Sequence, residues 1–135
     1  MRALKEVLGL VILVVVIIVP LRMFVAQPFV VDGLSMFPTF HHGDYLIIDE
    51  FSYHFSDPVR GDVIVFRYPN DPRVFYIKRV IGLPGETVKV DRGVVSITKT
   101  DGTLLTLEEP YVVAEDATYD TSTTLGDGQY FVMGD

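Results

Sequence analysis

The chain has 135 residues, a length that suits one domain of ordinary size with a short appendage but not two domains. Its formal net charge of −7 makes nucleic acid a poor partner, since binding to phosphates needs a basic surface. Because the sequence contains no cysteine, disulfides, a cysteine nucleophile and thiolate metal ligands are excluded.

The N-terminal segment is strongly apolar. Every residue from 7 to 19 is apolar or glycine, and residues 21–26 continue the pattern with Arg22 as the only charge. About 20 such residues are needed to cross a bilayer, so we predict a transmembrane helix. Pro20 and Arg22 lie near one end, where a kink and a snorkelling charge are tolerated. A cleavable export signal is disfavoured because the large Phe24 occupies a position that needs a small residue.

The basic residues at the start of the chain predict its orientation. Arg2 and Lys5 precede the apolar run, and positive charge favours the cytoplasmic side. We therefore expect residues 1–26 to form a cytoplasmic tip and single-pass anchor in the plasma membrane. Residues 27–135, which carry the excess of acidic side chains, would form one extracytoplasmic domain.

After residue 27 the apolar residues fall in short runs between turn signals, a pattern typical of strands. We predict a mainly β protein, built on an antiparallel or barrel-like sheet. The expected strands are 29–31, 45–49, 62–68, 74–81, 87–90, 94–98, 103–107 and 129–132. Asp101-Gly102 is the strongest hairpin signal. The polar, threonine-rich segment 108–128 is expected to be an exposed loop.

Two segments carry side chains of chemical interest. The first, residues 33–39, reads Gly-Leu-Ser-Met-Phe-Pro-Thr and places Ser35 in a turn shaped by glycine and proline. In the second, residues 76–86, strand alternation puts Lys78 on the same face as Tyr76 and Val80. An ammonium among apolar groups loses hydration, which lowers its pKa and makes the neutral amine available as a base. Taken separately, the two patterns favour a structural serine and an ordinary strand lysine over catalytic residues.

Together the two segments resemble the signal peptidase I family of bacterial type I signal peptidases. Members carry Ser-Met-x-Pro-Thr shortly after a membrane span and Tyr-x-Lys-Arg-x-x-Gly-x-Pro-Gly farther along, and both patterns are present here in that order. A third family signature begins Gly-Asp-Asn, and the chain ends with Gly134 and Asp135. We expect this chain, which stops inside that signature, to be weakly active or inactive.

The resemblance implies a serine endopeptidase that removes signal peptides from exported preproteins, cutting after small residues of the Ala-x-Ala type. It implies Ser35 as nucleophile, Lys78 as general base, and backbone at Ser35 and Gly33 for the oxyanion. The candidates for substrate pockets, equally plausible as core residues, are Phe29, Val31, Met36 and Ile77. The residues expected to support the site are Pro38, Tyr76, Arg79, Gly82, Pro84, Gly85, Gly134 and Asp135.

The expected partners are preprotein signal peptides and the lipid bilayer, with no nucleic acid, no metal and no cofactor. His41, His42 and His54 lack the spacing of metal ligands and are expected on the surface. Two other functions stay open: a self-cleaving or regulatory serine–lysine protease, and a membrane-tethered β domain that only binds partners. The sequence leaves the oligomeric state undefined.

Overall fold

The computed structural model describes the backbone of residues 2–24, 26–49, 52–107 and 121–135, and the side chains of residues 4–20, 28–49, 52–107 and 121–135. These residues divide into two compact units. Unit 1 comprises residues 1–30 and 45–57, and unit 2 comprises residues 31–44 and 58–135. The predicted nucleophile and base, Ser35 and Lys78, both belong to unit 2.

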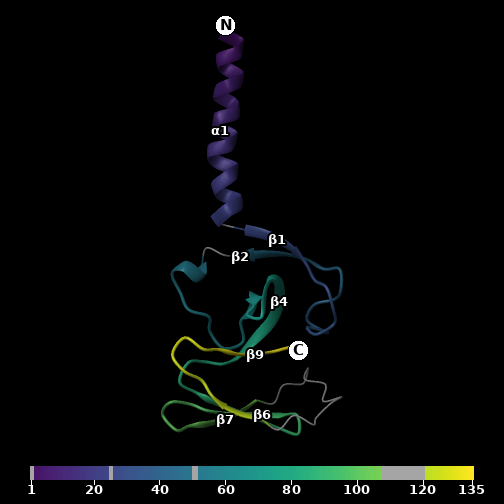
Figure 1. Cartoon of the computed structure of the whole chain (residues 1–135), viewed down its shortest axis with the longest axis vertical. Helices are drawn as coiled ribbons and strands as arrows, with labels where there is room; N and C mark the ends of the chain where they lie inside the picture. The colour runs from purple at the N-terminus through teal and green to yellow at the C-terminus, as the bar shows by residue number, and fades with distance from the viewer. Residues whose placement is uncertain (1, 25, 50–51, 108–120) are drawn as a thin grey trace. The chain divides into compact units, whose positions relative to one another are not determined.

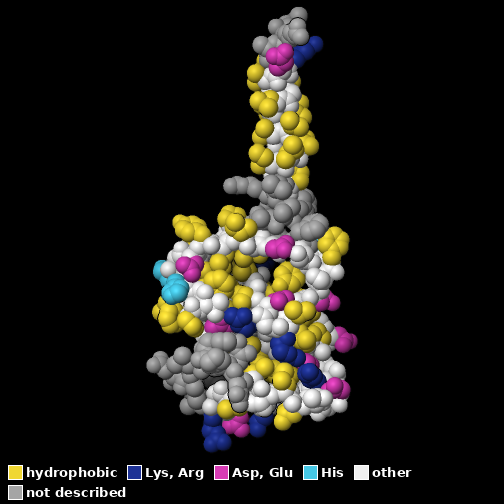
Figure 2. Space-filling view, turned by 180° about the vertical axis from the view of Figure 1, so that it is seen from behind, with side chains coloured by type: hydrophobic (Ala, Val, Ile, Leu, Met, Phe, Trp, Pro, Cys, Tyr) yellow, Lys and Arg dark blue, Asp and Glu magenta, His cyan; other side chains and the backbone are white. Residues whose placement is uncertain are grey.

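Unit 1 begins with the helix α1 (Arg2–Phe24), which covers most of the predicted anchor. Its described side chains, residues 4–20, are all exposed, and Figure 2 shows hydrophobic side chains along the helix. Pro20 lies inside the helix near its end. Within the residues that the structure describes, no helix is both long enough and apolar enough to cross a membrane. The predicted transmembrane span is therefore not confirmed.

The rest of unit 1 is a two-stranded antiparallel sheet and a short 3-10 helix. Strand β1 (Ala26–Val30) pairs with β2 (Tyr45–Asp49), with Val30 opposite Tyr45. The 3-10 helix η1 (Ser52–His54) follows. The bounds of β2 match the prediction, whereas β1 begins and ends earlier than the predicted strand 29–31.

Unit 2 contains a three-stranded antiparallel sheet in the order β3-β4-β9, formed by β3 (Val63–Tyr68), β4 (Asp71–Gly82) and β9 (Phe131–Met133). Figure 1 shows β4 and β9 side by side. Strand β4 starts before the predicted strand 74–81 because the turn needs only residues 69 and 70. Pro72 is tolerated early in this strand, where one ladder donor is dispensable. Strand β4 thus carries Lys78 between two neighbouring strands.

A four-stranded antiparallel sheet completes unit 2, in the order β7-β6-β5-β8. Its strands are β5 (Thr87–Asp91), β6 (Val94–Thr98), β7 (Leu104–Leu107) and β8 (Thr121–Thr124). Alternate residues of β5 and β6 are buried and face the core, as the period of two requires. The core cluster consists of Ile81, Val88, Val90, Val95, Ile97 and Leu125.

The mainly β, antiparallel class predicted from the sequence is confirmed. One prediction was wrong: the expected loop 108–128 contains β8, which pairs with β5. Strand β8 reads Thr-Ser-Thr-Thr and is mostly exposed, so the apolar alternation that indicates other strands is missing. Threonine nevertheless favours strands because its side chain is branched at Cβ. The remainder of the predicted loop, residues 108–120, lies outside the described residues.

Candidate active site

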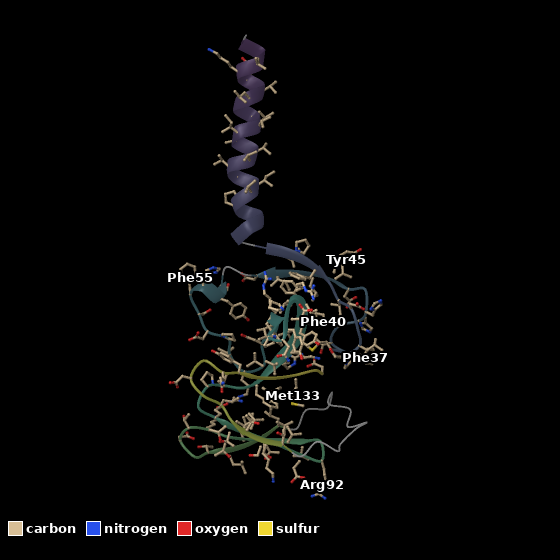
Figure 3. All side chains as sticks on the ribbon, in the orientation of Figure 1. Phe37, Phe40, Tyr45, Phe55, Arg92 and Met133 are labelled. Atoms are coloured by element: carbon tan, nitrogen blue, oxygen red, sulfur yellow. The ribbon has the colours of Figure 1, made fainter. Side chains whose placement is uncertain are left out.

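Ser35 lies in a tight turn between β1 and β2 in the chain. The turn is held by a hydrogen bond from the Phe37 N–H to the Leu34 carbonyl (3.0 Å) and by one from the Phe40 N–H to the Met36 carbonyl (2.7 Å). The Met36 side chain is 1% exposed and fixes the turn to the core, while Ser35 itself is exposed. Figure 3 labels Phe37 and Phe40 of the same turn. The local structure therefore holds the backbone of Ser35 in place and leaves its side chain accessible.

Lys78 lies in β4, opposite Ile64 of β3. It is partly buried, and this burial lowers the pKa of its amine below the usual lysine value. The negative charge of Asp135 acts in the opposite direction and offsets part of the effect. The net result is an amine that loses its proton at a lower pH than an exposed lysine does.

Gly134 brings these two residues together. If Gly134 carried a Cβ, that atom would overlap the Ser35 carbonyl oxygen and lie 3.3 Å from the Lys78 Nζ. The Ser35 backbone and the Lys78 amine thus both lie beside the position that a Gly134 side chain would occupy. Only glycine, which has no side chain, leaves this space free. The three residues come from the three sequence segments singled out above, which lie far apart in the chain.

Asp135 links the same three segments by hydrogen bonds. Arg79 donates to both carboxylate oxygens, from Nε at 2.8 Å and from Nη2 at 2.6 Å. The Thr39 hydroxyl donates to Oδ2 at 2.5 Å, and Arg79 Nη2 lies 3.3 Å from the Thr39 hydroxyl. The Asp135 side chain is 1% exposed, so the pair is protected from water. This network fastens the end of the Ser35 turn to the strand that carries Lys78.

The carboxylate of Asp135 stays ionised in this setting. Burial works to raise its pKa, but the hydrogen bonds from Arg79 and Thr39 and the positive charge of Arg79 outweigh that effect. The pKa therefore lies below the usual aspartate value. The negative charge of ionised Asp135 in turn raises the pKa of Lys78.

A second ion pair supports the turn that follows Lys78 along the chain. Arg60 Nη2 lies 2.5 Å and 2.7 Å from the two carboxylate oxygens of Glu86, and Arg60 Nη1 donates to the Ile81 carbonyl. Glu86, which is 6% exposed, also accepts the Leu83 N–H at 2.8 Å. Despite its burial, these bonds hold the pKa of Glu86 below the usual value. Glu86 and Arg60 thus fix the end of β4.

The predicted supporting residues occupy structurally restricted positions around this turn. A Cβ on Gly82 would lie 2.9 Å from Leu125 Cδ1, so β4 and the core pack closely there. Gly85 has φ +80°, a conformation that other residues rarely adopt, and Pro84 precedes it. Tyr76 instead contacts Phe66 and Tyr68 on the β3–β4 hairpin.

The remaining predicted site residues stay predictions. Val31 and Met36 are 5% and 1% exposed, which suits packing in the core. Ile77 is partly buried, and Phe29 belongs to unit 1. Pro38 lies in the Ser35 turn. None of these positions demonstrates a substrate pocket.

Three residues that stabilise this region, Thr39, Arg60 and His42, have no role that the sequence predicts. Thr39 was part of the first motif, but only the fold reveals that it donates to Asp135. Arg60 is distant from Glu86 in the sequence, and no motif indicates that the two side chains pair. His42 was expected on the surface and is exposed, yet its Nδ1 lies 3.3 Å from the Gly33 nitrogen. Among the described residues, no group of acidic or histidine side chains could hold a metal ion.

Comparison with known proteins identifies the family. The family model described as "Signal peptidase, peptidase S26" matches residues 4–135. The chain is 40% identical over 138 residues to "Probable signal peptidase I-1" of Synechocystis sp., covering 97% of this chain and 68% of that protein. It is 46% identical over 88 residues to "Signal peptidase I" of Pseudomonas fluorescens, covering 56% of this chain and 31% of that protein.

A third relative, "Signal peptidase I" of Leptolyngbya laminosa, is 42% identical over 106 residues, or 73% of this chain and 49% of that protein. The chain therefore spans between 31% and 68% of the length of these three relatives. The family match itself extends over nearly every residue, including Ser35, Lys78, Gly134 and Asp135. The chain belongs to the signal peptidase family, peptidase S26.

Proposed function

We propose that this protein is a membrane-bound serine endopeptidase that removes signal peptides from exported preproteins, with Ser35 as nucleophile and Lys78 as general base. The observation that carries the proposal is the convergence of the Ser35 backbone and the Lys78 amine on Gly134. The lowered pKa of Lys78 supports it, because a base must be deprotonated to accept a proton. Relatives named signal peptidase I support the choice of substrate.

In the proposed first step, neutral Lys78 Nζ takes the proton of the Ser35 hydroxyl while Oγ bonds to the scissile carbonyl carbon. The Ser35 N–H is the proposed donor to the resulting oxyanion. The intermediate then collapses, the peptide C–N bond breaks, and the lysine ammonium gives its proton to the departing amine. This leaves the signal peptide joined to Ser35 as an ester.

In the second step the same amine deprotonates a water molecule, which attacks the ester carbonyl. The ester C–O bond breaks, the proton returns to Ser35 Oγ, and the signal peptide leaves with a new carboxylate. No histidine or aspartate partner is required, provided that the lysine is neutral. The resemblance to the signal peptidase I family suggests substrates with small residues before the cut, of the Ala-x-Ala type.

We also propose that the N-terminal helix attaches the protein to the plasma membrane, with the catalytic domain on the extracytoplasmic side. The uninterrupted apolar run of residues 7–19 and the basic residues before it support this. Recovery in the membrane pellet after alkaline carbonate treatment tests it. A protein released by that treatment would contradict the anchor and leave the protease proposal standing.

Cleavage of a preprotein with an Ala-x-Ala site by the full-length protein tests the chemistry. Ser35→Ala and Lys78→Ala should each lower kcat/KM by at least about a thousandfold. Ser122→Ala and Lys99→Ala make the same substitutions at exposed positions and should leave the rate unchanged. Normal cleavage by either site variant would refute the proposed roles. Binding of preprotein without cleavage by the wild-type protein would instead favour the binding-domain alternative.

A further inference from the structure

The Ser35 turn is part of a loop that closes on itself in unit 2. The Val31 N–H donates to the Asp44 carbonyl, and the Gly43 N–H donates to the Val31 carbonyl, both at 2.9 Å. The His41 N–H donates to the Asp44 side chain at 2.8 Å. These bonds fix the base of the loop. The path of the chain just before Ser35 depends on fewer contacts.

One of those contacts comes from His42. The Gly33 N–H, two residues before Ser35, donates to His42 Nδ1 at 3.3 Å. The same Nδ1 lies 3.3 Å from Asp32 Oδ1. Gly33 has φ +111°, so the backbone adopts a conformation here that depends on glycine and on its local hydrogen bonds.

The two contacts of Nδ1 require different protonation states. An N–H donor needs a lone pair on Nδ1, which only the neutral ring with its proton on Nε2 offers. A carboxylate partner needs a proton on Nδ1, as in the charged ring. One nitrogen cannot satisfy both at once. Protonation of His42 therefore removes the bond to Gly33 and favours the contact with Asp32.

We infer that His42 is a positioning residue for Ser35, whose neutral ring holds the Gly33 amide and whose protonation releases it. This inference rests on the function proposed above for Ser35. Within the part of the chain that the structure describes, the charged and titratable groups that face the ring or its neighbours in the loop are Asp32, His41 and Asp44. Asp44 lies 3.8 Å from His41 Nδ1. Asp32 is 94% exposed, so water screens its attraction for the charged ring. The contact with Asp32 therefore does not replace the bond that holds the Gly33 amide.

The consequence is a pH dependence separate from that of Lys78. Histidine changes its charge between about pH 5 and pH 8. When the His42 ring takes up a proton, the wild-type protein should lose the Gly33 bond, and with it about three- to tenfold in kcat/KM, the factor that one ordinary hydrogen bond contributes. Protonation of Lys78 at lower pH also reduces kcat/KM, but this reduction is the same in wild type and in every His42 variant.

The test is kcat/KM of the full-length protein between pH 5 and pH 8 on a peptide with an Ala-x-Ala site, for wild type, His42→Asn and His42→Ala. The asparagine side-chain oxygen can accept the Gly33 N–H at every pH. The ratio of His42→Asn to wild type should be near one at pH 8 and rise about three- to tenfold at pH 5. His42→Ala should be slower than wild type at pH 8. The ¹⁵N resonance of Gly33 should titrate in wild type and not in His42→Asn.

A constant ratio together with a Gly33 resonance that does not titrate would overturn the inference. So would faster cleavage by His42→Ala, because it would mean that a free Gly33 amide serves the reaction better. Failure of the proposed function is distinguishable: Ser35→Ala would then still cleave the peptide. If Ser35 is required and the ratio is constant, the His42 inference alone fails.

Discussion

Gly134 and Ser35 are in direct contact, and no side chain fits between them: a Cβ on Gly134 would overlap the Ser35 carbonyl oxygen. Gly134→Ala should therefore displace the Ser35 turn and lower kcat/KM at least tenfold, with a loss of about 1–3 kcal/mol in the free energy of unfolding from overpacking. Gly126→Ala is the matched control. There the nearest atom, 3.3 Å away, is the end of the Gln129 side chain, which can move. Equal activity in the two variants would contradict the tight contact.

The burial of Lys78, which suits its proposed role as a base, should also lower the free energy of unfolding. Its folded-state pKa is lowered, so the unfolded chain binds the proton more tightly and the folded protein is destabilised wherever the unfolded lysine is charged. Lys78→Met should remove this cost and raise the unfolding free energy at neutral pH, while abolishing cleavage.

The gain from Lys78→Met should shrink as the pH rises from the folded-state pKa of Lys78 towards the usual lysine value, since both states then lose the proton. Urea unfolding at several pH values measures it. The control is Lys99→Met, at an exposed position. A Lys78→Met variant less stable than wild type at neutral pH would show that the amine is well solvated or well paired.

Asp135 should set the pH at which the enzyme becomes active. Its negative charge raises the pKa of Lys78, so Asp135→Asn should lower that pKa and move the acid limb of the kcat/KM profile to lower pH. The maximal rate should also fall, because the amide forms weaker bonds with Arg79 and Thr39. Thr39→Val separates the two effects: it removes one hydrogen bond to Asp135 and keeps the charge. An unshifted acid limb in Asp135→Asn would contradict the coupling.

The Arg60–Glu86 pair should stabilise the fold mainly because Arg60 compensates the buried charge of Glu86, and less because its side chain fills space. Arg60→Met leaves a buried carboxylate without its cation and should cost about 3–5 kcal/mol. The double variant Arg60→Met/Glu86→Gln removes that charge and should be more stable than Arg60→Met. Chemical denaturation of both proteins at pH 7 provides the comparison, and a less stable double variant would contradict it.

The same pair predicts a loss of stability in acid. The folded-state pKa of Glu86 is lowered, so its contribution is fully present above the usual glutamate pKa of about 4.3 and is lost as the pH falls through the lower folded value. Wild type and Glu86→Gln should thus converge in stability on acidification below about pH 4. A difference between them that stayed constant to pH 2 would mean that Glu86 titrates as an unperturbed group.

Much of unit 2 could be predicted from the sequence because strands buried on one face repeat every two residues. Val88 and Val90, like Val95 and Ile97, alternate with polar or exposed neighbours, and the structure buries all four. Strand β8 escaped prediction since it pairs at a sheet edge and buries little apolar surface. Alternation reports burial, so a strand that stays exposed gives no such signal.

In the candidate site, too, some residues could be predicted from the sequence and others could not. Ser35, Lys78 and Asp135 stood out because their motifs resemble those of a known family. The contacts of Thr39 with Asp135, and of Arg60 with Glu86, depend on which segments the fold brings together. Spacing in the chain carries no information on such pairs, which are 96 and 26 residues apart. The bond between His42 and Gly33 is local, but the sequence alone does not reveal where the ring points.

We propose that Lys78 is neutral beside Ser35, and direct titration of the Lys78 side chain tests this proposal most closely. The ε-methylene and amine resonances of Lys78, assigned with Lys78→Met, should titrate in the Ser35→Ala protein at a midpoint below the usual lysine value. The acid limb of kcat/KM in the wild-type protein should follow the same group. A Lys78 that titrates like an exposed lysine, in a protein that still cleaves at neutral pH, would contradict the account.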